Sequence, residues 1–69
     1  MAVVKVIELL AESNESWEAA TQNAVAEAVK TVRNIQTVYV RHLQAIVEGN
    51  KIAKYRVNVK ISFIVQEQQ

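Results

Sequence analysis

An apolar side chain stands at every odd position from 53 to 65, and the residues between them are mostly polar. The odd residues are Ala53, Tyr55, Val57, Val59, Ile61, Phe63 and Val65. Because successive side chains of a strand point to opposite faces, this alternation predicts one long strand with one covered face. A strand over residues 53–65 spans roughly 40 Å, which is long for a domain of this size. We expect it to curve around another element or to reach a neighbouring chain.

One turn signal organises the second half of the chain. The segment Glu48-Gly49-Asn50 contains the only glycine, and the sequence has no proline. These residue types favour the tight turn of a β-hairpin. Residues 36–47, which precede the turn, are β-branched and aromatic in character, so they are predicted to form the partner strand of the hairpin.

The first half of the chain reads as a strand followed by a helix. Residues 3–11 are rich in Val, Ile and Leu, as expected for a largely covered strand. Ser13 is followed by Glu15 and Glu18, which is typical of a hydroxyl cap with acids at the positive end of a helix. The helix is therefore predicted over residues 14–34. The element order indicates an α+β fold, β-α-β-β, in a single domain over residues 1–69.

The predicted helix carries an apolar stripe at steps of three and four residues. Its members are Trp17, Ala20, Ala24, Ala28, Val32 and Ile35. This spacing predicts one packed face, and the small alanines would let the helix axis lie close to a sheet. As the first member of the stripe, Trp17 is interpreted as a core residue, with a stacking surface for a planar ligand as the alternative.

Size and composition predict a homo-oligomer. A 69-residue domain buries only about 60% of the surface of its unfolded chain, and the absence of cysteine excludes disulfide support. The hydrophobic share of 51% exceeds what one small core can cover, and an interface between copies would cover the rest. The net charge of +1 favours neither a nucleic-acid nor a membrane partner. Lys5 and Glu8 interrupt the N-terminal apolar stretch, so we expect neither a signal peptide nor a membrane span, and a cytoplasmic location.

The sequence offers little for catalysis. His42 is the single histidine, the chain has no aspartate, and one glycine cannot build a phosphate-binding loop. His42 is interpreted as structural rather than as a ligand, and the protein is predicted not to be an enzyme.

Two charged groups each have a structural and a functional interpretation. Lys54, Arg56 and Lys60 would protect an exposed edge strand, the alternative being a grip on phosphates. The four early glutamates are expected to be spread apart by strand and helix geometry and to form a solvated acidic helix start, the alternative being a metal site. They are Glu8, Glu12, Glu15 and Glu18.

The order of three segments resembles the dodecin family. They are SWEAA at 16–20, AVAEAVKTVRNI at 24–35 and KYRVNVKISF at 54–63, and the resemblance covers residues 3–65. It implies a three-stranded antiparallel sheet that wraps the helix. It also implies a hollow shell of twelve copies, a homododecamer, that binds, stores or buffers a small molecule without catalysis.

The resemblance maps ligand-binding positions onto Thr37, Gln44 and Arg56. In family members that bind flavin (FMN, riboflavin or FAD), ring pairs stack between symmetry-related tryptophans near the start of the second strand, and a glutamine of the third strand binds the ring edge. Here Thr37 replaces the tryptophan and Arg56 replaces the glutamine. Threonine has no π-face and arginine is only a donor, so both departures argue against flavin binding.

The pattern without the stacking tryptophan is more similar to a divergent branch of dodecins, one member of which is calcium-bound. The resemblance assigns no metal ligands to this chain. The alternatives that stay open are an anion facing Arg56, a cation such as calcium, or a structural assembly without a stored ligand.

Overall fold

The computed structural model describes residues 2–67, which form one helix and three strands. The elements are β1 (Ala2–Ser13), α1 (Trp17–Ala28), β2 (Ile35–Glu48) and β3 (Lys51–Glu67). This order confirms the predicted β-α-β-β arrangement.

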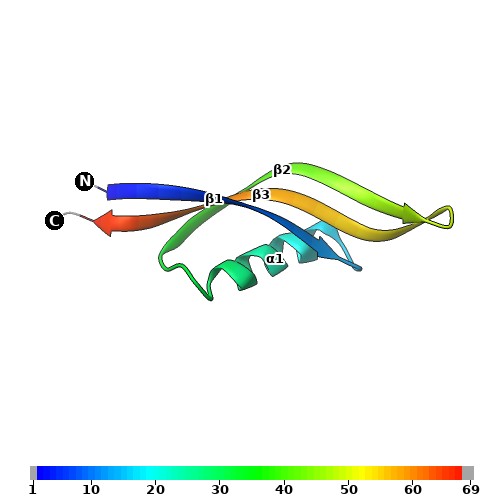
Figure 1. Cartoon of the computed structure of the whole chain (residues 1–69), viewed down its shortest axis with the longest axis horizontal. Coiled ribbons are helices and arrows are strands. Elements are labelled where there is room, and N and C mark those ends of the chain that lie inside the picture. Colours follow the sequence, from blue (N-terminus) through cyan, green and yellow to red (C-terminus); the bar gives the residue numbers. More distant parts are fainter. Residues whose placement is uncertain (1, 68–69) are drawn as a thin grey trace.

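The strands form one antiparallel sheet in the order β1-β3-β2, with α1 against one face (Figure 1). The hairpin places β3 beside β2, and the helical connection lets β1 pair with the other side of β3. β3 is therefore the central strand. The interpretation of Lys54, Arg56 and Lys60 as protectors of a strand edge is wrong for Arg56 and Lys60, where both sides of β3 are paired, whereas Lys54 is paired with β2 alone.

The helix begins three residues later than the sequence suggested. Ser16 is its N-cap, with extended backbone (φ −170°), and its side chain accepts a hydrogen bond from the Ala19 amide at 2.9 Å. The Ser13 hydroxyl instead accepts from the Glu15 amide at 2.9 Å in the turn that precedes the helix. Both serines have acids downstream, so the local pattern does not separate them. Because β1 continues to Ser13, the chain needs the next residues to reverse its direction, and the helix can be capped only at Ser16.

The helix also ends earlier than predicted, at Ala28 rather than near Asn34. The next residues include β-branched Val29, Thr31 and Val32, which are weak helix formers. The chain reverses there, and Asn34 takes a left-handed conformation (φ 62°) that asparagine tolerates better than most residues.

The core lies between the helix and the middle of β3. Ala20, Ala24 and Ala28 are 0–3% exposed, which confirms the predicted alanine stripe. Facing them are the fully buried odd residues of β3, Val57, Val59 and Ile61, joined by Phe63 at 7%. Val32 and Ile35 pack at the edge of this core from the turn and from β2.

The predicted hairpin turn is confirmed. Gly49 and Asn50 both have positive φ (59° and 65°), as the tight two-residue turns that match strand twist require. From this turn β3 runs through the whole molecule, whose longest extent is 55 Å. The hairpin end extends beyond the helix and beyond the end of β1, and we call residues 46–54 the hairpin arm (Figure 1).

Candidate functional site

One protomer brings together two of the three ligand positions named by the resemblance. Gln44 on β2 and Arg56 on β3 are direct register partners. Thr37 is paired with Ser62, six positions further along β3 from Arg56. That separation is roughly 20 Å along a strand. A small ligand therefore cannot contact all three residues of a single protomer.

Thr37 offers a hydroxyl and no ring. It is exposed, and its hydroxyl lies within hydrogen-bond distance of the Ser62 hydroxyl on the neighbouring strand. This cross-strand pair satisfies two small polar groups on the face of the sheet away from the helix.

Arg56 is bonded within its own protomer. Its Nε donates a hydrogen bond to Oε2 of Glu12 at 2.8 Å, and its Nη2 lies 2.6 Å from the same oxygen in an ion pair. Glu12 is the register partner of Arg56 on β1, so the sheet holds the two side chains on the same face. Lys54 Nζ lies 3.8 Å from the other carboxylate oxygen of Glu12. We call Glu12, Lys54 and Arg56 the ion cluster.

The ion cluster keeps Glu12 ionised. The hydrogen bond from Arg56 is the main reason that the pKa of Glu12 lies below its ordinary value of 4.5. Partial burial works in the opposite direction, and the positive charges of Arg56 and Lys54 add to the lowering of this pKa. The side chains of Glu12 and Arg56 remain 35% and 37% exposed, so solvent still screens their attraction.

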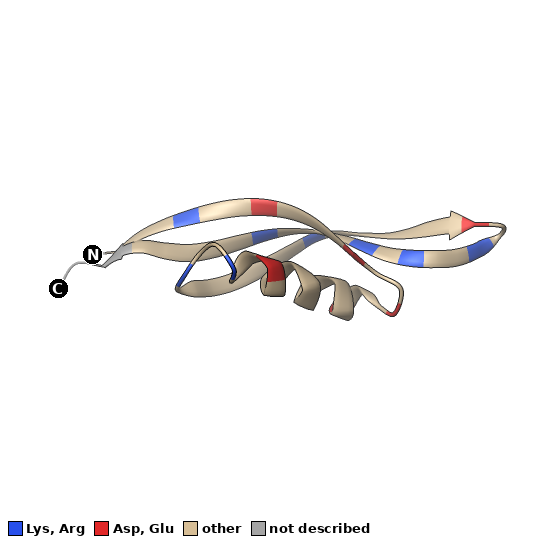
Figure 2. Ribbon diagram, turned by 60° about the horizontal axis from the view of Figure 1, so that its bottom comes forward, with Lys and Arg blue, Asp and Glu red and all other residues tan. Residues whose placement is uncertain are grey.

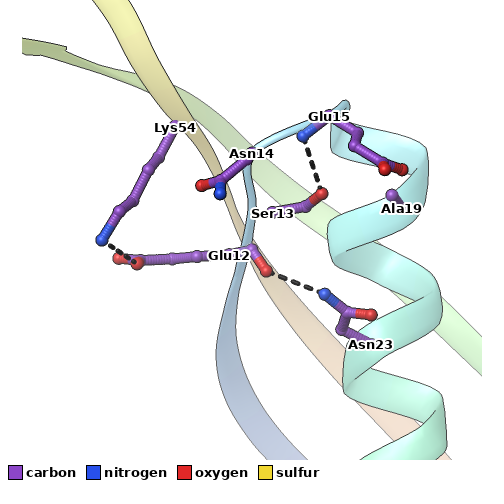
Figure 3. Close-up of a pocket in the computed structure, with 7 residues that line it drawn as sticks. All are labelled: Glu12, Ser13, Asn14, Glu15, Ala19, Asn23 and Lys54. Carbon is purple, nitrogen blue, oxygen red and sulfur yellow. Dashed lines mark hydrogen bonds and ion pairs between the residues drawn. The ribbon is translucent and has the colours of Figure 1, made fainter.

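A pocket of about 510 Å³ lies beside the ion cluster, where β1 passes into the helix (Figure 3). The Lys54 side chain extends toward Glu12 across its mouth, and the Asn23 side chain donates to the Glu12 carbonyl oxygen at 2.9 Å. The lining residues are Glu12, Ser13, Asn14, Glu15, Ala19, Asn23 and Lys54. The pocket is polar, with two carboxylates and one ammonium group.

This pocket was not predicted from the sequence. Glu12 and Glu15 both line it, whereas Glu8 and Glu18 are not among its lining residues. The Glu12 carboxylate is directed toward Lys54 and that of Glu15 lies by the helix (Figure 3), which agrees with the expectation that the early glutamates are spread apart. The signal that could have revealed the pocket is the short connection from Glu12 to Glu15, where the strand ends and the chain turns into the helix.

Trp17 is not a core residue, since it is 36% exposed. Its indole Nε1 donates to the backbone oxygen of Gln44 at 2.9 Å, and its ring meets Tyr55 edge to face, with centroids 4.9 Å apart. The tryptophan is the first residue of the helix, at the end of the stripe, and it contacts β2 and β3 from there. It holds β2 against the helix start and presents no ring to Thr37.

His42 is exposed and pairs in register with Asn58. Across residues 2–67, no group of three or more His, Cys, Asp or Glu side chains is arranged to hold a metal ion. Within the same range, the buried Oδ1 of Asn58 has no hydrogen-bond partner.

No helix in the described part of the chain is long and apolar enough to cross a membrane.

The fold defines a class of small proteins in which a three-stranded antiparallel sheet, ordered β1-β3-β2, curves around one helix and carries polar side chains on its helix-free face. The family model for dodecin matches residues 3–66. The chain belongs to the dodecin family.

Individual relatives agree with this assignment. The curated dodecin of Thermus thermophilus is 32% identical over 65 residues, with 94% of each chain covered. A crystal structure of a Thermus thermophilus protein superimposes with a TM-score of 0.91 at 31% identity, covering 99% of this chain and 100% of that one. The calcium dodecin of Mycobacterium tuberculosis, described as a calcium-chelating antigen, matches with a TM-score of 0.82 at 31% identity, covering 97% and 96%.

Proposed function

We propose that this chain is the non-enzymatic subunit of a homododecameric dodecin shell that binds a small molecule at contacts between protomers. The observation that carries the proposal is the amount of apolar surface that one protomer leaves uncovered. The ligand does not follow from the family alone, because Thr37 and Arg56 differ from the residues that the resemblance expects in flavin-binding dodecins.

A protomer alone is too extended for a stable globule. Its radius of gyration is 14.3 Å, whereas a compact chain of this length has about 11 Å. Its accessible surface is 5201 Å², whereas a folded monomer of its mass has about 4,400 Å². The excess, roughly 800 Å², is about what each partner contributes to a specific interface of ordinary size.

The uncovered apolar surface lies on the β2–β3 hairpin and on β1. Leu43 on β2 is 58% exposed, and on the hairpin arm Val47 and Ile52 are 62% and 55% exposed. On β1, the exposed fractions of Val6 and Leu10 are 52% and 66%. Exposed apolar patches of this extent are typical of surfaces that bind another protein. A second copy of the chain is the partner that the family implies.

The separation of the ligand positions also favours an assembled site. Thr37 lies roughly 20 Å along the sheet from Gln44 and Arg56, so a site that uses all three positions takes them from different protomers. Flavin stacking in the family's manner is not supported, because Thr37 supplies no ring and Arg56 is occupied by Glu12. We propose a ligand other than a stacked flavin pair.

Calcium is a specific candidate for the ligand. The similarity to the calcium dodecin of Mycobacterium tuberculosis and the two carboxylates in the pocket favour it. Glu12 is already bonded to Arg56, which leaves Glu15 as the carboxylate of the pocket without an ion pair among the described residues. Calcium takes six to eight oxygen ligands, so a calcium site here would draw further oxygens from a second protomer or from water.

Native mass spectrometry of the purified protein, together with an absorbance scan, tests the proposal. A colourless twelve-subunit complex whose mass exceeds twelve chains would support a shell with a ligand other than flavin. Calcium titration of the same sample then identifies or excludes that ion. A monomer at micromolar concentration would refute the assembly, and a yellow complex would refute the exclusion of flavin.

A further inference from the structure

Arg56 has a neighbour on each side because it lies on the central strand. Glu12 faces it from β1 and Gln44 faces it from β2. Of the five N–H donors of the guanidinium, the one on Nε is used by Oε2 of Glu12, and Nη2 lies 2.6 Å from the same oxygen. The remaining donors, the Gln44 amide and the Lys54 ammonium are the polar groups that a ligand on this face could meet.

Glu12 is the only acidic member of the ion cluster, and its carboxylate offsets one of the two positive charges. Its carboxylate receives Arg56 on one oxygen, at 2.6 Å, and approaches Lys54 with the other, at 3.8 Å. Without this carboxylate, two cations would stand two positions apart on the same face of β3, beside an amide donor. An arginine fork beside a lysine is the usual recognition element for phosphate and sulfate groups.

We propose that Glu12 is a specificity-determining residue, which excludes dianionic ligands from the Gln44 and Arg56 position and reserves it for uncharged ones. The carboxylate occupies the guanidinium edge that an anion would use, and its own charge repels the anion. The inference rests on the proposed function only in treating this position as a ligand site. All members of the ion cluster belong to one protomer, so the exclusion is measurable whatever the assembly state.

Sulfate is a suitable probe because it remains a dianion over the working pH range. We expect Glu12→Gln to bind sulfate more tightly than the parent protein by about tenfold or more at low ionic strength, since one negative charge near the anion is removed. Isothermal titration calorimetry of the assembled protein at neutral pH measures this. The double variant Glu12→Gln with Arg56→Gln should return to the parent affinity, because the anion then loses the guanidinium donors of Arg56.

A matched control separates the local effect from a change in net charge. Glu27 forms an exposed ion pair with Lys30 on the helix, at 3.1 Å, so Glu27→Gln removes the same charge away from the ion cluster. This variant should bind sulfate like the parent. If Glu12→Gln does not fold, Glu12→Thr removes the charge while keeping a residue that suits a strand.

The proposal is overturned if removal of the Glu12 charge leaves the sulfate affinity unchanged, if Glu27→Gln gains as much, or if the double variant keeps the gain. Native mass spectrometry of each sample reports assembly separately. A parent protein that is not a dodecamer would refute the proposed function, whereas the sulfate comparison would still decide the role of Glu12.

Discussion

Replacing Ile52 by alanine should weaken assembly without unfolding the protomer. Ile52 and Val47 are cross-strand partners on the hairpin arm, and both are more than half exposed. Full burial of an isoleucine contributes about 1.5–3 kcal/mol. Covering the 55% that is exposed in the protomer would contribute about 0.8–1.7 kcal/mol per copy. Loss of that term weakens each contact roughly 4- to 18-fold.

Sedimentation velocity over a dilution series measures this effect. The midpoint of assembly should move to higher concentration for Ile52→Ala, and by only about twofold for Ile52→Val, which removes a single methylene. Circular dichroism at a concentration where both variants are assembled should match the parent. If Ile52→Ala assembles at the same concentration as the parent, the hairpin arm is not part of the interface and the argument from exposed surface fails.

Three further outcomes test the fold, the ion cluster and the ligand site. Ser16→Ala should destabilise the protein by about 1 kcal/mol through loss of the helix cap, and Ser13→Ala by less, as seen in urea denaturation; equal losses would contradict the cap assignment. Because the pKa of Glu12 is lowered in the folded state, its contribution to stability is present above pH 4.5 and is lost as the pH falls below that value. The difference in melting temperature between parent and Arg56→Gln should therefore shrink in acid, and a constant difference would argue against the ion cluster. Thr37→Trp combined with Arg56→Gln should yield a yellow complex with riboflavin, while a colourless intact complex would mean that the site differs beyond these two positions.

The parts of the fold that were predicted correctly depend on local periodicity. The alternation around Val59 and the stripe around Ala24 each place side chains on one face of one element, and the structure buries both. The element ends were predicted less well, because they depend on where the neighbouring element stops. Ser13 could not be recognised as the end of β1 without knowing the register of β1 against β3.

The site was harder to predict because its key contact is remote in sequence. Glu12 and Arg56 are 44 residues apart, and only the sheet order brings them together. An interpretation of β3 as an edge strand leaves Arg56 in solvent. Trp17 was misplaced for a related reason, since helix spacing alone does not show that the first residue of the stripe stays 36% exposed while the alanines further along are buried.

The central position of β3 also explains why Arg56 requires a partner such as Glu12. A charged side chain on a central strand is flanked on both sides, so it loses part of its hydration and needs a cross-strand counter-charge. Figure 2 shows basic bands recurring along the hairpin end of β3 and acidic bands on β1. Glu12 is the acid that the register places beside Arg56. Arg56 is thus balanced by an acid within the same chain. A change of charge at this position would then require a coordinated change of both residues rather than of Arg56 alone.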